Sequence, residues 1–335
     1  MKKRSRTSVW GKSFKRSLAA MSRMATMAGT RAYADALKPA LARRAPPPGD
    51  GAWIPGAVMG PAGARRFRLY IPTGVKLGDR LPLMVMLHGC GQDANSFAAS
   101  TGMNRIAMRE RFLVLYPEQD RLANGRGCWN WFDTDNGRAY GDAALIMQAI
   151  DQVCLLHPVD KTRIAIAGLS AGASMAALLV TRHPDRFKAV VMHSGIPPGT
   201  AHSGMSALSA MRGHRPTLPL ATPPGAMDHH WPPLLVIHGD ADAVVAPHNG
   251  EAAAQVWAQA AGARATPARS VRRGKRYPMA VTDFKRQGSI VATLVAVDGL
   301  AHAWSGGAAS KPYSDGGGPD ASRMAWTFAA KQFRA

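Results

Sequence analysis

The chain has 335 residues, of which 46% are hydrophobic and 19% charged, as is typical of a globular protein. Its longest apolar runs have the length of strands, so the sequence predicts no transmembrane helix, which would need about 18 uninterrupted apolar residues. Apolar residues recur in bursts with turn residues between them, which excludes low-complexity disorder for most of the chain. Lys and Arg number 42 against 21 Asp and Glu, giving a formal net charge of +21.

The positive charge is concentrated in two segments. Residues 1–45 hold twelve Lys and Arg and a single acid, Asp35. A second basic cluster lies near the other end of the chain and consists of Arg264, Arg269, Arg272, Arg273, Lys275, Arg276, Lys285 and Arg286. Because the charge is localised, we expect no nucleic-acid partner.

The N-terminal segment has the pattern of a basic amphipathic helix. Trp10, Phe14 and Leu18 fall on one helical face, and the basic residues lie mostly elsewhere. Residues 10–16 interrupt any hydrophobic stretch of the length that a secretory signal needs, so we expect no such signal. Two interpretations stay open: a solvated, partly ordered tail, or a segment that contacts an anionic or hydrophobic surface such as a storage granule.

A Pro- and Gly-rich stretch at residues 45–51 follows this tail. It predicts a tail and linker over residues 1–49 and one folded domain over residues 50–335. Strand-like apolar runs then alternate with helical patterns, of which residues 143–156 and 171–182 are the clearest. Continuously apolar strands that alternate with helices favour an α/β fold, doubly wound around a parallel sheet. The predicted strands are residues 66–71, 83–87, 112–116, 163–167, 189–192, 234–237 and 290–297.

The strongest chemical signal is Gly-Leu-Ser-Ala-Gly at residues 168–172. It follows a predicted strand and precedes a predicted helix, which is the context that a nucleophile elbow requires. Small residues on both sides of Ser170 leave room for a strained backbone. Ser170 is therefore the candidate nucleophile, and the alternative is a Gly-rich turn that only joins strand to helix.

A serine nucleophile needs a base and a carboxylate that orients the base. In this type of fold they follow the serine in the order acid, then histidine. Asp240 and Asp242 both follow the strand at 234–237; Asp240 is close enough to the strand end to cap the turn, so we favour Asp242. Only His248 and His302 come later, and His302 is favoured because it lies in a Gly-containing loop after the last predicted strand.

An oxyanion hole needs two backbone amides that point at the developing charge. The first expected donor is Ala171, directly after the nucleophile. The second is expected in the turn after the strand at 83–87, and Cys90 is the favoured amide donor there. His88 precedes this turn and is interpreted as a structural hydrogen-bonding group; Cys90 as a catalytic thiol is disfavoured because the serine set is complete without it.

Six segments together resemble the poly(3-hydroxybutyrate) depolymerase family of esterases, over about residues 65 to 330. The resemblance implies an α/β-hydrolase fold, related to feruloyl and acetylxylan esterases, with Ser170, Asp242 and His302 as catalytic triad. It also assigns the oxyanion role to the turn that contains Cys90. The segments are residues 88–92, 116–119, 128–132, 168–172, 238–242 and 299–307.

We therefore predict a serine esterase acting on an ester or polyester, as a poly(3-hydroxybutyrate) or short-chain hydroxyalkanoate depolymerase does. The first alternative is a carbohydrate esterase of feruloyl or acetylxylan type. An alternative from another class is a non-catalytic basic protein that binds a surface or nucleic acid on a hydrolase scaffold. We expect no cofactor, and no metal, because His229 and His230 lack the spacing and accompanying ligands of a metal site.

Two further features concern the pocket and the compartment. Trp304, two residues from His302, is favoured as a wall of the substrate pocket over core packing, and Trp129 or Trp131 is expected to face the pocket. Of three cysteines, Cys90 and Cys128 could pair only in an oxidising compartment. The sequence favours the cytoplasm, with an extracellular location as the alternative.

Overall fold

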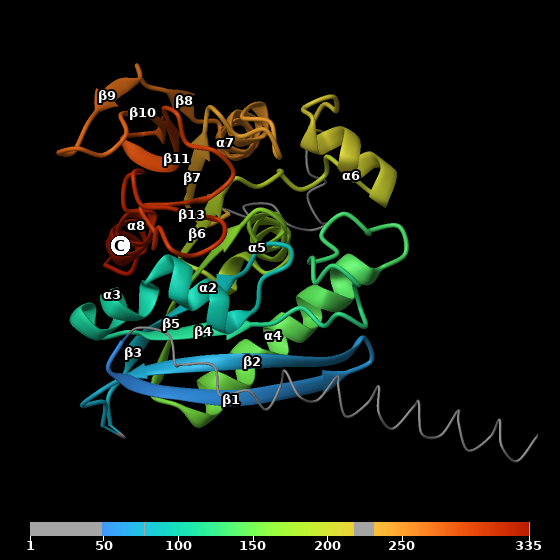
Figure 1. The fold of residues 1–335 in the computed structure, drawn as a ribbon, viewed down its shortest axis with the longest axis vertical. Coiled ribbons are helices and arrows are strands. Elements are labelled where there is room, and N and C mark those ends of the chain that lie inside the picture. Colours follow the sequence, from blue (N-terminus) through green and yellow to red (C-terminus); the bar gives the residue numbers. More distant parts are fainter. Residues whose placement is uncertain (1–48, 77, 218–230, 335) are drawn as a thin grey trace, which may run out of the picture. The chain divides into compact units, whose positions relative to one another are not determined.

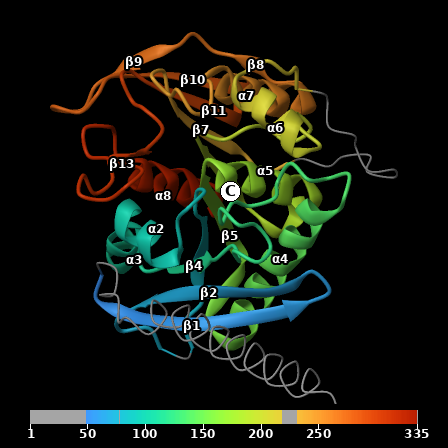
Figure 2. The ribbon, with the colours of Figure 1, turned by 45° about the vertical axis from the view of Figure 1, so that its right-hand side comes forward.

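The computed structural model describes residues 49–76, 78–217 and 231–334 (Figures 1 and 2). The chain divides into two units, Met1–Ala45 and Pro46–Ala335, and every described residue belongs to the second, which is compact. The basic tail and the pair His229 and His230 lie outside the described residues, so the predictions about them stay predictions.

A mixed sheet of eleven strands runs through the second unit. The strands lie in the order β1-β2-β4-β3-β5-β6-β7-β11-β10-β8, with β9 also paired to β10. Neighbours from β4 through β11 are parallel, and the pairs outside this block are antiparallel. The strands are β1 (Gly51–Gly60), β2 (Gly63–Pro72), β3 (Leu81–Leu87), β4 (Leu113–Pro117), β5 (Val159–Leu169), β6 (Ala189–His193), β7 (Leu234–Gly239), β8 (Arg264–Ala265), β9 (Arg269–Val271), β10 (Met279–Arg286) and β11 (Ser289–Val297).

Helices join most of the parallel strands. They are α2 (Ala94–Thr101), α3 (Met103–Glu110), α4 (Arg138–Leu156), α5 (Ala171–Arg182), α6 (Gly204–Met211), α7 (His248–Ala261) and α8 (Ala321–Gln332), with a short 3-10 helix η1 (Pro184–Arg186). Two short strands, β12 (Trp304–Ser305) and β13 (Ser314–Asp315), form a separate parallel pair. α6 lies in the long connection between β6 and β7.

The sheet separates two hydrophobic cores. On β3, Leu83, Val85 and Leu87 belong to a cluster with residues of α4, α5 and α7. The alternating residues Met84 and Met86 belong to the other cluster, with residues of α2, α3 and α8. Because both faces are covered, both sets of side chains are buried, which explains the continuously apolar run. The predicted doubly wound α/β architecture is confirmed.

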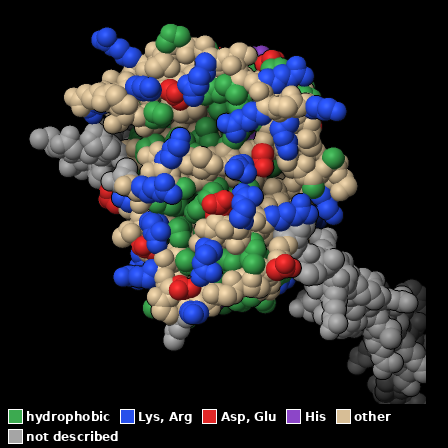
Figure 3. Space-filling model, turned by 90° about the vertical axis from the view of Figure 1, so that its left-hand side faces the viewer, with side chains coloured by type: hydrophobic (Ala, Val, Ile, Leu, Met, Phe, Trp, Pro, Cys, Tyr) green, Lys and Arg blue, Asp and Glu red, His purple; other side chains and the backbone are tan. Residues whose placement is uncertain are grey.

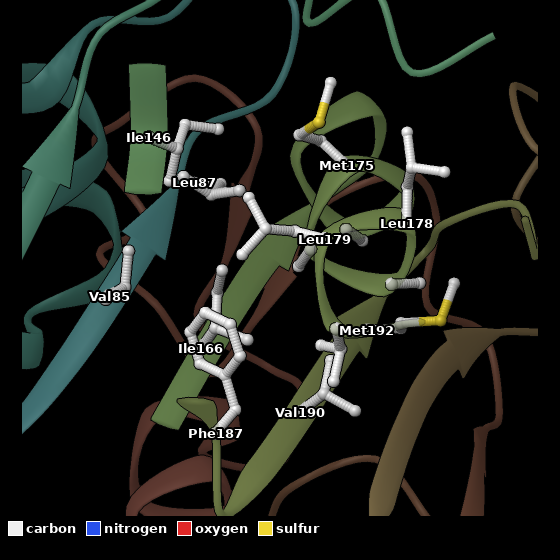
Figure 4. Packing of buried hydrophobic residues seen from close by; sticks show 14 of the residues in the cluster. Val85, Leu87, Ile146, Ile166, Met175, Leu178, Leu179, Phe187, Val190 and Met192 are labelled. Atoms are coloured by element: carbon white, nitrogen blue, oxygen red, sulfur yellow. The ribbon is translucent and has the colours of Figure 1, made fainter. Parts of the chain in front are cut away.

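Figure 4 shows part of the first core, where Leu179 of α5 faces the strands that carry Ile166 and Val190. All three side chains are fully buried. This packing holds α5 against β5 and β6. The nucleophile elbow joins β5 to α5, so the first core helps to position the candidate site.

The surface carries scattered cationic side chains. Figure 3 shows the side of the molecule at the left of Figure 1, where Lys and Arg outnumber acidic side chains. The second basic cluster lies on β8, β9, β10 and their connections, and most of its members are exposed. Within it, Arg269 forms an ion pair with Asp283 at 2.7 Å. None of the described helices is both long enough and apolar enough to cross a bilayer.

Candidate active site

Ser170 lies in the sharp turn between β5 and α5. Its backbone has φ 55° and ψ −121°, a region that residues other than glycine rarely adopt. Strain of this kind is typical of functional turns and of the nucleophile elbow in particular. The Ser170 amide donates a hydrogen bond to the carbonyl of His193 at 2.8 Å, which ties the turn to the end of β6.

The two glycines of the elbow are required by close backbone contacts. A Cβ on Gly168 would overlap the backbone of Gly172, and a Cβ on Gly172 would overlap the carbonyl oxygens of Leu87 and His88. The elbow therefore packs directly against the turn that follows β3. Both glycine positions of the Gly-x-Ser-x-Gly pattern are therefore required because a side chain at either one would overlap backbone atoms.

His302 and Asp242 form the second part of the site. His302 Nδ1 lies 2.8 Å from Asp242 Oδ2. A carboxylate can only accept, so Nδ1 carries the proton and the other ring nitrogen, Nε2, is left as an acceptor. The two side chains are 10% and 0% exposed. The arrangement is that of a general base held in one tautomer by a buried acid.

The surroundings of Asp242 keep it ionised. Its Oδ1 accepts hydrogen bonds from the amides of Val244 and Val245 at 2.9 and 2.8 Å. His238 Nε2 lies 3.5 Å from Oδ2. Burial alone would raise the pKa of the carboxyl, but the hydrogen bonds from His238, His302 and the Val245 amide outweigh burial and lower its pKa below the usual range.

The alternative acid and base lie elsewhere. Asp240 is exposed and its Oδ1 accepts the Gly299 amide at 2.6 Å, so it holds the turn after β11. This is the backbone-capping role that the sequence suggested. His248 is the first residue of α7, and its exposed ring lies 3.9 Å from Glu251.

Sheet order places nucleophile, acid and base on one edge. Ser170 follows β5, Asp242 follows β7 and His302 follows β11. These strands are parallel; β6 lies between β5 and β7, and β11 pairs with β7. Among the described residues, no hydrogen bond joins the Ser170 hydroxyl to the His302 ring. The structure thus brings the acid and base into contact and places the serine on the same edge. Catalytic hydrogen bonds often tighten only when substrate is bound.

The two predicted oxyanion donors have no competing acceptors. Neither the Cys90 amide nor the Ala171 amide donates a hydrogen bond within the described part of the chain. Leu87 of β3 pairs with Gly168 of β5, so the turns that carry these amides follow neighbouring strand ends. Ala171 is also the first residue of α5, where the helix dipole favours negative charge.

Several bonds fix the turn that contains Cys90. The Gln119 amide donates to His88 Nε2 at 3.0 Å, so Nδ1 carries the proton and donates to the Gly89 carbonyl at 2.8 Å. Burial lowers the pKa of His88, which therefore stays neutral. A disulfide joins Cys90 to Cys128. The turn is thus held from two sides.

Residues 65–276 match the protein family described as "Esterase PHB depolymerase". The chain belongs to this family. Its members are esterases by that description, and the resemblance seen in the sequence is confirmed.

Individual relatives share part of the chain. Poly(3-hydroxyalkanoate) depolymerase C of Paucimonas lemoignei is 32% identical over 205 residues, which are 59% of this chain and 49% of that protein. The match thus spans about half the length of that relative. Feruloyl esterase B of Thermothelomyces thermophilus is 26% identical over 217 residues, 59% of this chain and 72% of that protein.

A solved structure with a similar fold is the acetyl xylan esterase from Aspergillus awamori. It superposes with a TM-score of 0.62 at 16% identity and covers 82% of this chain and 99% of its own. At this identity the likeness concerns the fold, which is that of the α/β-hydrolases.

The structure corrects the expectation for the aromatic residues of this esterase-family chain. Trp304 is fully buried, donates its indole N–H to Ser322 Oγ at 3.0 Å and packs edge-on against Phe97. Trp129 is also fully buried, and its indole donates to the His88 carbonyl at 3.1 Å. Trp131 is 7% exposed. Trp304 and Trp129 belong to the core and do not line a substrate pocket, because both side chains are fully buried and their indole N–H groups are satisfied inside the protein. Trp131 packs edge-on against Phe132.

Sequence reasoning missed a buried polar network beside the oxyanion turn. Asp142 of α4 forms an ion pair with Arg65 and accepts from Gln119 Nε2 at 2.7 Å and from the Asn130 amide at 3.0 Å. These bonds fasten the segments that hold His88 to α4. The signal was available: an acid within the apolar face of a helix needs a buried partner.

Two buried histidines, His193 and His238, were also missed. Each lies at or near the carboxyl end of a central strand, beside the strand that carries a triad member. Chain order excluded both as the base, and nothing local indicated a supporting role. Among residues 49–76, 78–217 and 231–334, no group of three or more His, Cys, Asp and Glu is arranged to hold a metal ion.

Proposed function

We propose that this protein is a serine esterase that hydrolyses carboxylic esters with Ser170, His302 and Asp242. The observation that carries the proposal is the 2.8 Å bond between His302 and Asp242 on the sheet edge where Ser170 adopts its strained turn. Membership of an esterase family supports the same reaction.

In the proposed acylation step, His302 Nε2 takes the proton of the Ser170 hydroxyl as Oγ attacks the ester carbonyl carbon. Asp242 stabilises the imidazolium that forms. The carbonyl oxygen becomes an oxyanion, and the amides of Cys90 and Ala171 donate to it. The tetrahedral intermediate then breaks its bond to the leaving alkoxide, which takes the proton from His302 and departs as an alcohol.

Deacylation uses the same groups with water in place of the serine. His302 removes a proton from water as its oxygen attacks the acyl carbonyl, and returns that proton to Ser170 Oγ as the acid leaves. The enzyme is regenerated and one ester bond has been exchanged for an alcohol and an acid. No cofactor is needed to balance these steps.

For the substrate, we propose a polyester or oligoester of short hydroxyalkanoic acids. The relative with 32% identity, named a poly(3-hydroxyalkanoate) depolymerase, supports this choice. Feruloyl and acetylxylan esters are the second candidate, favoured by relatives with 24 to 26% identity that carry those names. Product release from amorphous poly(3-hydroxybutyrate), compared with release from feruloyl and acetylxylan esters, discriminates between the two.

For the compartment, the Cys90–Cys128 disulfide favours an oxidising environment, because thiols are kept reduced in the cytosol. The cytoplasm that the sequence favours, and granule contact through the basic tail, remain predictions.

The test of the reaction is Ser170→Ala in the full chain, assayed with a chromogenic short-chain ester. We expect turnover to fall by about 10³-fold or more, with an unchanged unfolding midpoint. Ser310→Ala, at an exposed loop position, is the matched control and should retain wild-type turnover. Undiminished turnover by Ser170→Ala would remove this serine from the mechanism.

A further inference from the structure

We propose that His193 is a positioning residue that fixes the loop carrying His302 relative to the Ser170 elbow. The inference rests on the proposed serine-esterase function. No direct hydrogen bond joins Ser170 to His302 among the described residues. We assign the link between them to His193, which is buried and neutral.

The backbone of His193 holds the nucleophile. It is the last residue of β6, the strand that lies between β5 and β7. It pairs with Leu169, the last residue of β5, and its carbonyl accepts the Ser170 amide at 2.8 Å. The position of the elbow is therefore set directly by His193.

The ring of His193 holds the loop of the base. Its Nε2 accepts the backbone amide of Ser305 at 3.0 Å, three residues after His302. An amide can only donate here, so Nε2 is unprotonated and Nδ1 carries the proton, with Ser194 Oγ as its acceptor at 3.2 Å. The ring also stacks on Trp304, with the centroids 5.1 Å apart and the planes 28° apart.

The neutral form of His193 is enforced by its surroundings. The side chain is completely buried, and burial, followed by the charges of His238 and His302, lowers its pKa to about 3. Nε2 therefore remains an acceptor for the Ser305 amide at neutral pH. A protonated ring would lose this bond, since both nitrogens would be donors.

The need for such a link follows from how His302 is anchored. Asp242 holds the ring of His302 from the side of β7 and makes no hydrogen bond to the Ser170 elbow among the described residues. The His193–Ser305 bond anchors the loop's backbone on the side of β6, next to the elbow. His193 thus bonds both to the Ser170 elbow and to the loop that carries His302. A shift of about 1 Å between reacting groups can cost about 10²-fold in rate.

Two amide variants isolate the ring nitrogen that matters. The side-chain oxygen of Gln reaches the place of Nε2, whereas that of Asn reaches only the place of Nδ1. We expect His193→Gln to keep turnover within about threefold of wild type. We expect His193→Asn to lower kcat by about 10- to 100-fold with KM within about twofold, because the loop loses its bond to the end of β6, next to the elbow. Both variants place a polar amide in the same site, so a general cost of burying an amide affects them alike.

A double-variant cycle separates positioning from a purely structural role. If His193 acts through His302, His193→Asn should leave the residual turnover of His302→Ala unchanged. A further loss of similar size in that background would overturn the proposal, and so would equal activities of the Gln and Asn variants. Should the Asn variant fail to fold, His193→Gln decides alone: turnover near wild type with a retained unfolding midpoint supports the link, and loss of turnover in a folded Gln variant overturns it.

The proposed function has its own, separate outcome in this experiment. If His302→Ala by itself keeps wild-type turnover, the esterase mechanism fails. If His302→Ala abolishes turnover while His193→Asn does not change it, the mechanism stands and only the positioning role is overturned.

Discussion

Gly172, in the first turn of α5, packs directly against the backbone carbonyl of Leu87 at the end of β3, with no room for a side chain between them. The contact joins two structural parts that the proposed chemistry uses together. One is the elbow with Ser170 and the Ala171 amide, and the other is the turn with the Cys90 amide. The separation of the two oxyanion donors is therefore set by a glycine that takes no part in the reaction.

Replacing this glycine should separate the two donors. Gly172→Ala is expected to lower the free energy of unfolding by about 1–3 kcal/mol, because the added methyl overlaps backbone atoms. It should also lower kcat more than it changes KM. Gly125→Ala is the control, since nothing lies within 4 Å of a Cβ there, and urea unfolding of both variants measures the difference. Equal stabilities of the two variants would contradict the contact.

The two neighbouring carboxylates should behave differently. Asp242→Asn is expected to lower kcat by about 10⁴-fold, because an amide no longer fixes His302 with the proton on Nδ1. Asp240→Asn keeps an oxygen for the Gly299 amide and should change kcat by less than about threefold. Steady-state kinetics on the same ester compares them. If kcat fell strongly in Asp240→Asn and only slightly in Asp242→Asn, Asp240 and not Asp242 would be the acid that orients His302.

The free energy of unfolding should depend on pH because the pKa of His193 differs between the folded and unfolded states. Its pKa is lowered from 6.5 to about 3 in the folded protein, so between these values the unfolded chain binds the extra proton. Stability therefore falls as pH falls in this window, by about 1.4 kcal/mol per pH unit from this residue. The pKa of the Asp242 carboxyl is also lowered in the folded protein, so its protonation reduces the free energy of unfolding further, at lower pH.

The measurement is urea unfolding at pH 7 and pH 5 for wild type and His193→Gln. Wild type should lose about 2 kcal/mol more than the variant, which has no imidazole to protonate. Identical losses in the two proteins would show that the His193 pKa does not differ between the folded and unfolded states.

The disulfide should stabilise both the fold and the oxyanion turn. It links residues separated by 38 positions, and its removal in a Cys90→Ala, Cys128→Ala double variant should cost about 3 kcal/mol. We also expect a lower kcat, because the turn that carries the Cys90 amide is then held from one side instead of two. Thiol titration of the denatured wild type should detect only Cys154, which is the free cysteine. Three reactive thiols in protein from its native compartment would show that the bridge does not form there.

The elements that were predictable from sequence are those with strong local signals. β3, β5, β6 and β7 are buried on both faces, so their runs are continuously apolar, and the helices between them are marked by periodicity and by Pro184. β1 and β10 escaped prediction. β1 contains Pro55 and several glycines, and β10 contains Asp283 and two exposed cations, so only pairing with β2 and β11 defines them as strands.

The candidate nucleophile was predictable from sequence, because a positive φ flanked by close backbone contacts demands a local pattern of small residues around Ser170. The sequence also narrowed the acid and base by their order along the chain. Two findings needed the folded structure: Trp304 and Trp129 belong to the core, and His193 contacts both the elbow and the loop of His302. Burial and hydrogen-bond partners depend on which strands lie side by side, and the neighbours of β6 come from segments that are distant in the chain.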